Sequence, residues 1–166
     1  TRNNFNGKCG YEPDSEESFR FGSFTTMGEF HIDTGIAESE ISDYRRILSL
    51  DSALVVVQFN AGGACFYRKF FSSYPDSIMI YRFECTRPGR QNLTFRYVAN
   101  PQASGSVEAD GTTGIVYNGR LDSNGMQFVI RARAVAESGT VTVENGAIKV
   151  IGADNVTFYV AGDTDY

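Results

Sequence analysis

The dipeptide Asn145-Gly146 separates two runs in which apolar and polar residues alternate, Thr140–Glu144 and Ala147–Ile151. Such a two-residue connection is the strongest short signal of a β-hairpin, because a type I′ turn requires positive φ at both central residues and Asn and Gly tolerate it. The resulting register pairs the apolar residues of the two runs on one face: Val143 with Ile148, and Val141 with Val150. We therefore predict a hairpin with one core-facing side.

Alternation with a period of two residues dominates from Phe21 to Val160. Clusters of Pro, Gly, Asn and Asp separate the other strand-like runs: Leu54–Phe59, Ala64–Phe71, Ser77–Cys85, Leu93–Val98, Gly114–Tyr117, Met126–Val135 and Val156–Val160. Many short strands without a convincing helical stretch predict an all-β domain built as an antiparallel β-sandwich. A closed barrel would show a similar pattern, and we favour the sandwich over it.

Three segments give finer expectations. Residues 54–57 are apolar on both faces, so we expect a central strand that is covered on both sides, joined to the next strand through Asn60-Ala61-Gly62-Gly63. Apolar residues in Ala37–Ile47 have helical spacing, but we interpret the segment as a loop leading into a strand. In Met126–Val135 every second residue is apolar, which predicts a half-buried strand with Arg131 and Arg133 facing solvent.

A length of 166 residues fits one domain. The Asn-rich and acidic start predicts an irregular lead-in over residues 1–20 and a single β-sandwich domain over residues 21–166. Because the sequence starts at Thr1 and shows no signal peptide, we expect an excised or processed piece of a longer protein.

Charge and hydropathy exclude two classes of partner. The formal net charge is -5, with Lys and Arg interspersed among Asp and Glu, so there is no basic stripe for nucleic acid. No apolar run approaches the ~20 residues that a membrane-spanning helix needs. We expect an acidic, water-exposed surface that does not bind nucleic acid. We also expect no membrane-spanning segment.

The three cysteines, Cys9, Cys65 and Cys85, cannot all form disulfides with one another. Their spacing matches no zinc signature, and His31 is the only histidine. Free, buried thiols that pack as small apolar side chains are the preferred interpretation, and one disulfide with an odd cysteine left over is the alternative.

Three groups of residues are candidate sites. Glu29, His31 and Asp33 alternate on one strand and share a face, but without a fourth ligand they are more typical of a solvated face than of a metal or acid–base site. Asp163 and Asp165 only loosely fit the carboxylate spacing of glycosidases, about 5 Å or about 6.5–9.5 Å, and are interpreted as turn or capping groups.

The third group is aromatic and surrounds the second hairpin: Tyr67, Phe70, Phe71, Tyr74 and Tyr81. Aromatic residues on paired strands usually pack in the core, which is the preferred interpretation. The alternative is that one or two of them line a sugar-binding groove. No catalytic residue, metal ligand or cofactor is predicted, and no carbohydrate-binding residue is assigned.

Two motifs carry a family resemblance. Residues 43–53, DYRRILSLDSA, resemble the "dYrReLdLdtA" stretch in the amino-terminal domain of glycoside hydrolase family 95, the α-L-fucosidase family. Residues 67–76, YRKFFSSYPD, resemble that family's "Y-x-R-x-x-F-x-S-x-P-D" strand and turn, with Arg68 one place off the spacing. Further matches follow in order over nearly the whole chain from about Phe21.

This resemblance implies an amino-terminal sandwich of the galactose-mutarotase-like, or supersandwich, type. Its partner would be an (α/α)6 barrel of the same full-length chain, and that barrel would carry the hydrolysis of α-L-fucosides. Family members usually start with an "L-P-x-G-N-G"-like turn and an "N-E-x-x-W"-like stretch, which are missing here, so we expect the sandwich to lack an early strand and to expose an edge.

The expected function is therefore that of a non-catalytic accessory domain of a secreted or periplasmic glycosidase, inactive alone, with fucosylated glycans as its possible ligands. The alternatives are a free-standing carbohydrate-binding module and an adhesive β-sandwich module. The absence of Trp counts against the first alternative, and the missing Cys-Trp-Cys pattern counts against an immunoglobulin-like version of the second.

Overall fold

The computed structural model describes residues 25–166, and nearly all of its regular structure is β-strand. One short 3-10 helix, η2 (Glu38–Glu40), lies among twelve strands. The strands are β1 (Gly28–Asp33), β2 (Ser42–Ser49), β3 (Leu54–Ala61), β4 (Ala64–Ser73), β5 (Ile78–Cys85), β6 (Gln91–Ala99), β7 (Ala103–Asp110), β8 (Gly114–Leu121), β9 (Gln127–Glu137), β10 (Thr140–Glu144), β11 (Ala147–Ala153) and β12 (Asn155–Thr164). Between Thr25 and Tyr166 no helix is long and apolar enough to cross a membrane.

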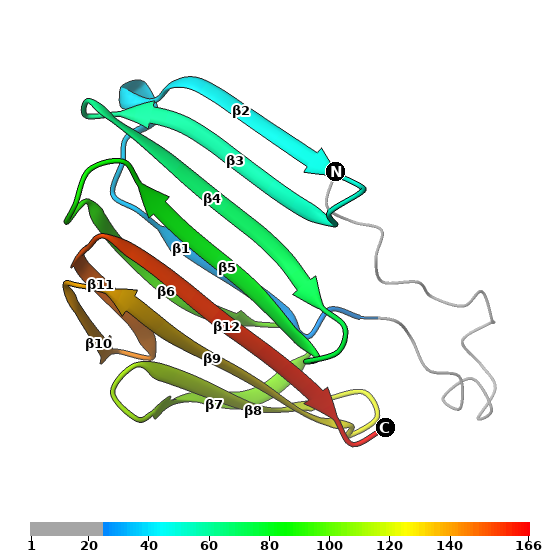
Figure 1. Cartoon of the computed structure of the whole chain (residues 1–166). Helices are drawn as coiled ribbons and strands as arrows, with labels where there is room; N and C mark the ends of the chain where they lie inside the picture. Colours follow the sequence, from blue (N-terminus) through cyan, green and yellow to red (C-terminus); the bar gives the residue numbers. More distant parts are fainter. Residues whose placement is uncertain (1–24) are drawn as a thin grey trace.

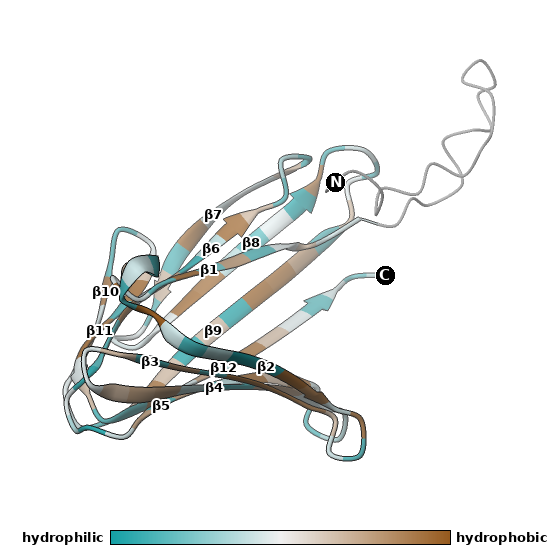
Figure 2. Ribbon diagram, turned by 90° about the horizontal axis from the view of Figure 1, so that it is seen from above, coloured by the Kyte–Doolittle hydropathy of each residue, from teal (hydrophilic) through white to brown (hydrophobic). Residues whose placement is uncertain are grey.

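The strands form two antiparallel sheets that pack face to face (Figure 1). The large sheet has eight strands in the order β2-β3-β4-β5-β12-β9-β8-β7, and the small sheet has four in the order β1-β6-β11-β10. Figure 2 shows the two layers from above, with β2 to β5 in one layer and β1 and β6 in the other. The predicted antiparallel β-sandwich is confirmed.

The Asn145-Gly146 hairpin forms as the sequence predicts. Asn145 has φ 51° and Gly146 has φ 71°, so both central residues occupy the left-handed region that a type I′ turn requires. β10 and β11 pair in the expected register, with Val141 opposite Val150 and Val143 opposite Ile148. The hairpin extends the small sheet because β11 pairs on its other side with β6.

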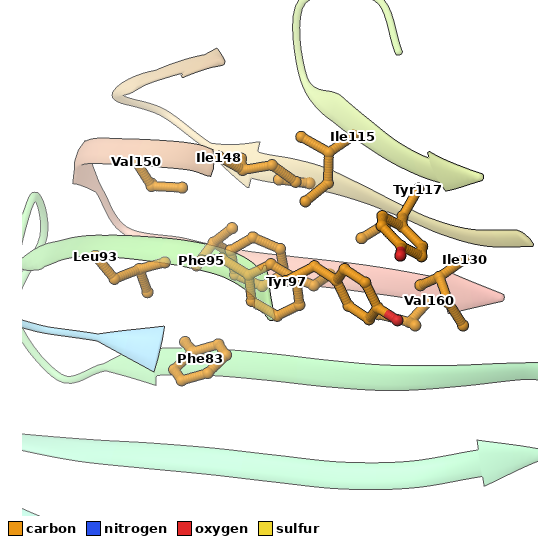
Figure 3. Close-up of a cluster of buried hydrophobic side chains, with 14 of the residues drawn as sticks. Phe83, Leu93, Phe95, Tyr97, Ile115, Tyr117, Ile130, Ile148, Val150 and Val160 are labelled. Carbon is orange, nitrogen blue, oxygen red and sulfur yellow. The ribbon is translucent and has the colours of Figure 1, made fainter. Parts of the chain in front are cut away.

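The main core lies between the small sheet and the β5, β12, β9 and β8 region of the large sheet (Figure 3). Phe95 of β6 stacks on Phe158 of β12 with ring centroids 4.3 Å apart, and both side chains are fully buried. Alternate residues of β9 also point into this core, whereas Arg131 and Arg133 face outward, as predicted. The apolar faces of β5, β12, β9 and β8 thus meet the apolar face of the small sheet.

A second core cluster lies at the turn end of β3 and β4 and consists of Val57, Phe59, Ala61, Ala64 and Phe66. Ile36 and Ile41, from the connection between β1 and β2, pack against it. This connection is loop and a single 3-10 turn before β2, which agrees with the interpretation of Ala37–Ile47 as a loop leading into a strand.

The expectation that residues 54–57 form a central strand covered on both sides is wrong. β3 is next to the edge of the large sheet, because β2 occupies the edge and pairs with it. Val57 is buried on the inner face, while Val56 points to the outer face and is only half-buried. The connection to β4 is also shorter than expected: Ala61 pairs with Ala64, and Gly62-Gly63 form the turn with φ of 53° and 70°.

β7 was not predicted. Its sequence, ASGSVEAD, contains few apolar residues, and most of its side chains are exposed because it is the other edge strand of the large sheet. The segment is a strand because it pairs with β8. Its sequence has no alternation of apolar and polar residues from which a strand could be predicted.

Candidate functional site

Glu29, His31 and Asp33 lie on β1 and alternate with the half-buried Phe30 and Ile32. His31 Nε2 lies 3.1 Å from Glu29 Oε2, and Asp33 Oδ1 accepts a hydrogen bond from the Gly35 amide at 2.9 Å. Across residues 25–166, no group of three or more His, Cys, Asp or Glu residues is placed to hold a metal ion. The trio therefore consists of an exposed hydrogen-bonded pair, His31 with Glu29, and a carboxylate that stabilises a turn.

Asp163 and Asp165 lie at the end of β12, where their carboxylates accept hydrogen bonds from backbone amides. Asp165 Oδ1 accepts a hydrogen bond from the Gln127 amide at 2.9 Å, while Asp163 Oδ1 accepts one from the Thr164 amide at 2.8 Å. An open depression of about 280 Å³ lies beside them, with Asn118 and Gln127 in its wall. The interpretation of Asp165 as a capping group agrees with these contacts, which extend the pairing of β12 with β9.

The five aromatic residues of the second hairpin separate into two groups. Phe70 and Tyr81 point inward and pack against one another with ring centroids 5.5 Å apart. Tyr67 lies on the opposite, outer face and is half-buried, whereas Phe71 is 39% exposed and Tyr74 is 95% exposed. Phe71 and Tyr74 are therefore the most exposed of the five aromatic residues.

Cys65 and Cys85 are free thiols, in agreement with the preferred interpretation, although both are half-buried and not fully buried. Cys85 pairs in register with Phe66, so it faces inward while Cys65 faces outward. Two cysteines on opposite faces of neighbouring strands are poorly placed for a disulfide. Cys9 lies outside the described residues.

A network of polar side chains crosses the outer face of the large sheet. The sequence pattern did not predict it. Lys69 Nζ lies 2.5 Å from Glu84 Oε2, and Arg82 Nε lies 2.8 Å from Glu84 Oε1. Arg82 also donates to Glu137 Oε1 at 3.0 Å and to the buried Thr157 Oγ1 at 3.1 Å. Asn155 Nδ2 completes the network by donating to Glu137 at 2.7 Å. Its members come from β4, β5, β9 and β12.

The network shifts the ionisation of its carboxylates. Burial alone would raise the pKa of Glu84, but hydrogen bonds from Arg82 and Lys69 outweigh it, so its pKa lies below the ordinary value. The hydrogen bond from Asn155, followed by that from Arg82, lowers the pKa of Glu137. Both groups therefore favour the ionised form, which suits structural ion pairs and not a proton-donating catalytic acid.

Replacing Glu84 by glutamine is expected to flatten the acid side of the stability profile. Because the pKa of Glu84 is depressed by folding, its contribution is present above the ordinary Glu value of about 4.3 and is lost as pH falls through the folded-state pKa. Thermal unfolding between pH 7 and pH 3 should show a smaller fall in Tm for E84Q than for wild type. E144Q is the control, since Glu144 forms only an exposed 3.5 Å pair with Lys149. Parallel pH profiles for E84Q and wild type would contradict the assignment.

A hollow of about 340 Å³ opens beside the main core where β3, β4 and β5 extend past the small sheet. Its wall is mostly apolar and includes Val55, Phe70, Met79 and Tyr81. Burial raises the pKa of Tyr81. No carboxylate is among the residues that line the hollow.

Comparison with known proteins gives one family and several relatives. Residues 3–166 match the family model described as "Glycosyl hydrolase family 65, N-terminal domain". A protein from Aspergillus niger named "Probable alpha-fucosidase A" is 29% identical over 153 residues, which cover 88% of this chain and 19% of that protein. "Alpha-L-fucosidase 2" from Arabidopsis thaliana is 36% identical over 55 residues, covering 33% of this chain and 6% of that protein.

Among solved structures, one described as "Putative kojibiose phosphorylase from human microbiome" matches with a TM-score of 0.53 and 12% identity, over 82% of this chain and 22% of that chain. At this identity the likeness concerns the fold alone. The chain thus spans about a fifth or less of the length of each of these relatives.

Proposed function

The chain belongs to the family of glycosyl hydrolase family 65 N-terminal domains, and from this premise we propose that it is a non-catalytic β-sandwich domain of a larger glycoside hydrolase. The family match extends over residues 3–166 and carries the proposal. The two-sheet architecture supports it, since the same fold occurs in part of a much longer solved chain.

We propose that the chain is non-catalytic because several of its carboxylates already form ion pairs with arginine or hydrogen bonds with the backbone. Hydrolysis of a glycosidic bond commonly requires two carboxyl groups that face each other across the sugar, one of them with a raised pKa. Within residues 25–166, Glu84 and Glu137 have lowered pKa values and bond to Arg82, while Asp165 caps the backbone of β9. None of these groups is free to protonate a leaving group.

For the whole protein we propose an α-L-fucosidase-like glycoside hydrolase. The names of the Aspergillus niger and Arabidopsis thaliana relatives support this activity, and so does the resemblance of residues 43–53 and 67–76 to glycoside hydrolase family 95. The matching family model carries the number 65, so membership of family 95 stays a proposal.

The partner that we propose for this domain is a catalytic (α/α)6 barrel in the same full-length chain. Secretion or a periplasmic location stays a prediction, and so does the division into a lead-in over residues 1–20 and a domain over residues 21–166.

The 166-residue chain alone is expected to release no fucose. Purified chain is incubated with 2′-fucosyllactose and with an aryl α-L-fucoside, with an active α-L-fucosidase as the positive control and buffer as the blank. Release should equal the blank at every concentration of the chain. Turnover that increases in proportion to the concentration of the chain would overturn the non-catalytic assignment.

The same preparation distinguishes the accessory role from that of a carbohydrate-binding module. Fucosylated glycans are titrated while tyrosine fluorescence is followed, because Tyr74 is 95% exposed and would respond to a bound sugar. No saturable change is expected. Saturation at submillimolar glycan would instead assign a carbohydrate-binding role to the chain.

A further inference from the structure

Two loops meet at one end of the sandwich, where the turn between β3 and β4 lies beside the connection between β5 and β6 (Figure 1). The turn consists of Gly62-Gly63, and the connection contains Arg87 and Arg90. A Cβ atom added to Gly62 would lie 2.6 Å from Arg90 Nη2, and one added to Gly63 would lie 3.3 Å from Arg87 Nη2. Both arginine side chains therefore reach the turn, and we call these four residues the glycine–arginine corner.

The turn leaves backbone donors unused. Gly62 and Gly63 both occupy the left-handed region, with φ of 53° and 70°, and the last strand pair before them is Ala61 with Ala64. The amides of the two glycines therefore have no partner in the ladder, and no other backbone hydrogen bond of residues 25–166 uses them. Successive free N–H groups in a turn form a concavity that suits an anion. Because glycine has no Cβ atom, the guanidinium groups can approach this turn closely.

The two arginines of the corner have no carboxylate partner. Neither Arg87 nor Arg90 forms an ion pair with a carboxylate of residues 25–166. The carboxylate of Asp154 instead accepts a hydrogen bond from the Gly89 amide, which lies between the two arginines in the chain, at 2.7 Å. The corner thus presents two guanidinium groups and two backbone amides as donors, on a chain whose net charge is -5. Its local charge is the opposite of that of the whole domain.

Hydrogen bonds hold the connection that carries the arginines in place. At its start, the Thr86 amide donates to the Cys65 carbonyl at 3.0 Å, and the Cys65 amide donates to Thr86 Oγ1 at 2.9 Å. In its middle, the Gly89 amide is bound to Asp154, at the corner between β11 and β12. The connection is therefore fixed to strands of both sheets. Donors that are positioned before a ligand arrives lose less conformational entropy on binding it.

The donors of the corner select the chemical class of its ligand. A guanidinium group offers paired N–H donors that match two oxygens of a carboxylate, sulfate or phosphate group. Charge-assisted hydrogen bonds of this kind are about twice as strong as those between neutral groups. All four residues of the corner are exposed, so a group that is attached to a larger molecule can also reach it. The ligand that fits is an oxyanion.

We propose that the glycine–arginine corner is a binding site for an oxyanion group, supplied by a free inorganic ion or by the carboxylate of an acidic sugar. Arg87 and Arg90 bind the oxygens of this group through their guanidinium N–H donors, and the free amides of the turn lie beside them. The site contains no carboxylate, so it binds and does not hydrolyse. The proposal is independent of the accessory role in a glycoside hydrolase, because it rests only on the groups of the corner.

An NMR titration of the 166-residue chain tests this proposal. Sodium sulfate and sodium glucuronate are added in separate series at constant ionic strength, and the amide shifts of Gly62 and Gly63 are followed. At least one of the two should give a saturable shift, with half-saturation at roughly 1–10 mM. R87Q and R90Q should each weaken this binding roughly tenfold, because a charge-assisted contact is lost. The amide shifts of β12, in the main core, should stay unchanged and report that the domain is folded.

Matched controls accompany the titration. R45Q removes an exposed arginine of β2 outside the corner and should bind as wild type does. R87K keeps the charge without the paired donors and should bind with intermediate affinity. The neutral sugar L-fucose should cause no shift. Saturation by glucuronate alone supports an acidic sugar as the ligand, and saturation by sulfate alone supports an inorganic ion. Shifts that rise linearly with both salts, or binding that is equal in wild type, R87Q and R90Q, would overturn the proposal.

Discussion

Replacing Phe95 by alanine is expected to destabilise the domain by about 3–5 kcal/mol. Phe95 is 0% exposed and stacks on Phe158 with ring centroids 4.3 Å apart, and it also meets Phe30 at 4.8 Å. These contacts join the small sheet to the centre of the large sheet. Removal of the ring would leave a cavity that rigid strands on both sides cannot close. Urea unfolding followed by circular dichroism measures the change in the free energy of unfolding.

V98A is the matched control for this substitution. Val98 lies on the same strand but faces outward and is 40% exposed, so its truncation should change the free energy of unfolding by no more than about 0.5 kcal/mol. F95L retains part of the apolar volume and should fall between wild type and F95A. A midpoint for F95A equal to that of V98A would show that Phe95 does not connect the two sheets.

Replacing Gly139 by alanine is expected to cost about 2–5 kcal/mol, the second large effect. Gly139 has φ +71°, where a side chain costs about 1–2 kcal/mol. A Cβ atom there would also lie 2.5 Å from the Ile151 carbonyl oxygen and 2.6 Å from the Ala153 nitrogen. These are backbone atoms of β11, so they cannot move aside as a flexible side chain can, and forced overpacking adds about 1–3 kcal/mol.

G111A separates the two contributions. Gly111 has the same φ of +71°, but an added Cβ would meet nothing within 4 Å. Its replacement should therefore cost only the backbone term of about 1–2 kcal/mol. Urea unfolding of both variants gives the contribution of the collision as the difference between them. Equal losses in G139A and G111A would mean that the turn before β10 relaxes and that its contact with β11 is not rigid.

In the candidate sites, alternation of residues predicted which side chains share a strand face, but not which distant side chains meet. Alternation correctly put Glu29, His31 and Asp33 on one strand face, and their neighbours of opposite parity point inward. The polar network around Arg82 could not be found in this way, because Arg82 and Glu137 are 55 positions apart and meet only when β12 inserts between β5 and β9. Ion pairs between strands depend on the order of the strands, which a local pattern does not contain.

Phe70 and Phe71 illustrate the same limit within one motif. Both belong to an aromatic run that could serve as core or as a sugar platform. Pairing of Phe70 with Tyr81 turns Phe70 toward the core, and Phe71 consequently points the other way and is 39% exposed. The residue types left the choice open, and the strand register decided it.

The sequence by itself determined features that depend on residues close together in the chain. The Asn145-Gly146 turn, the register of its hairpin and the inward face of β9 follow from turn chemistry and a two-residue period, and all three are present. Only the tertiary structure decided that β3 lies beside an edge strand, that a polar β7 completes the large sheet and that eight strands face four. The physical reason is that strand order is set by burial between distant segments, and many arrangements of the same strands would satisfy the same local pattern.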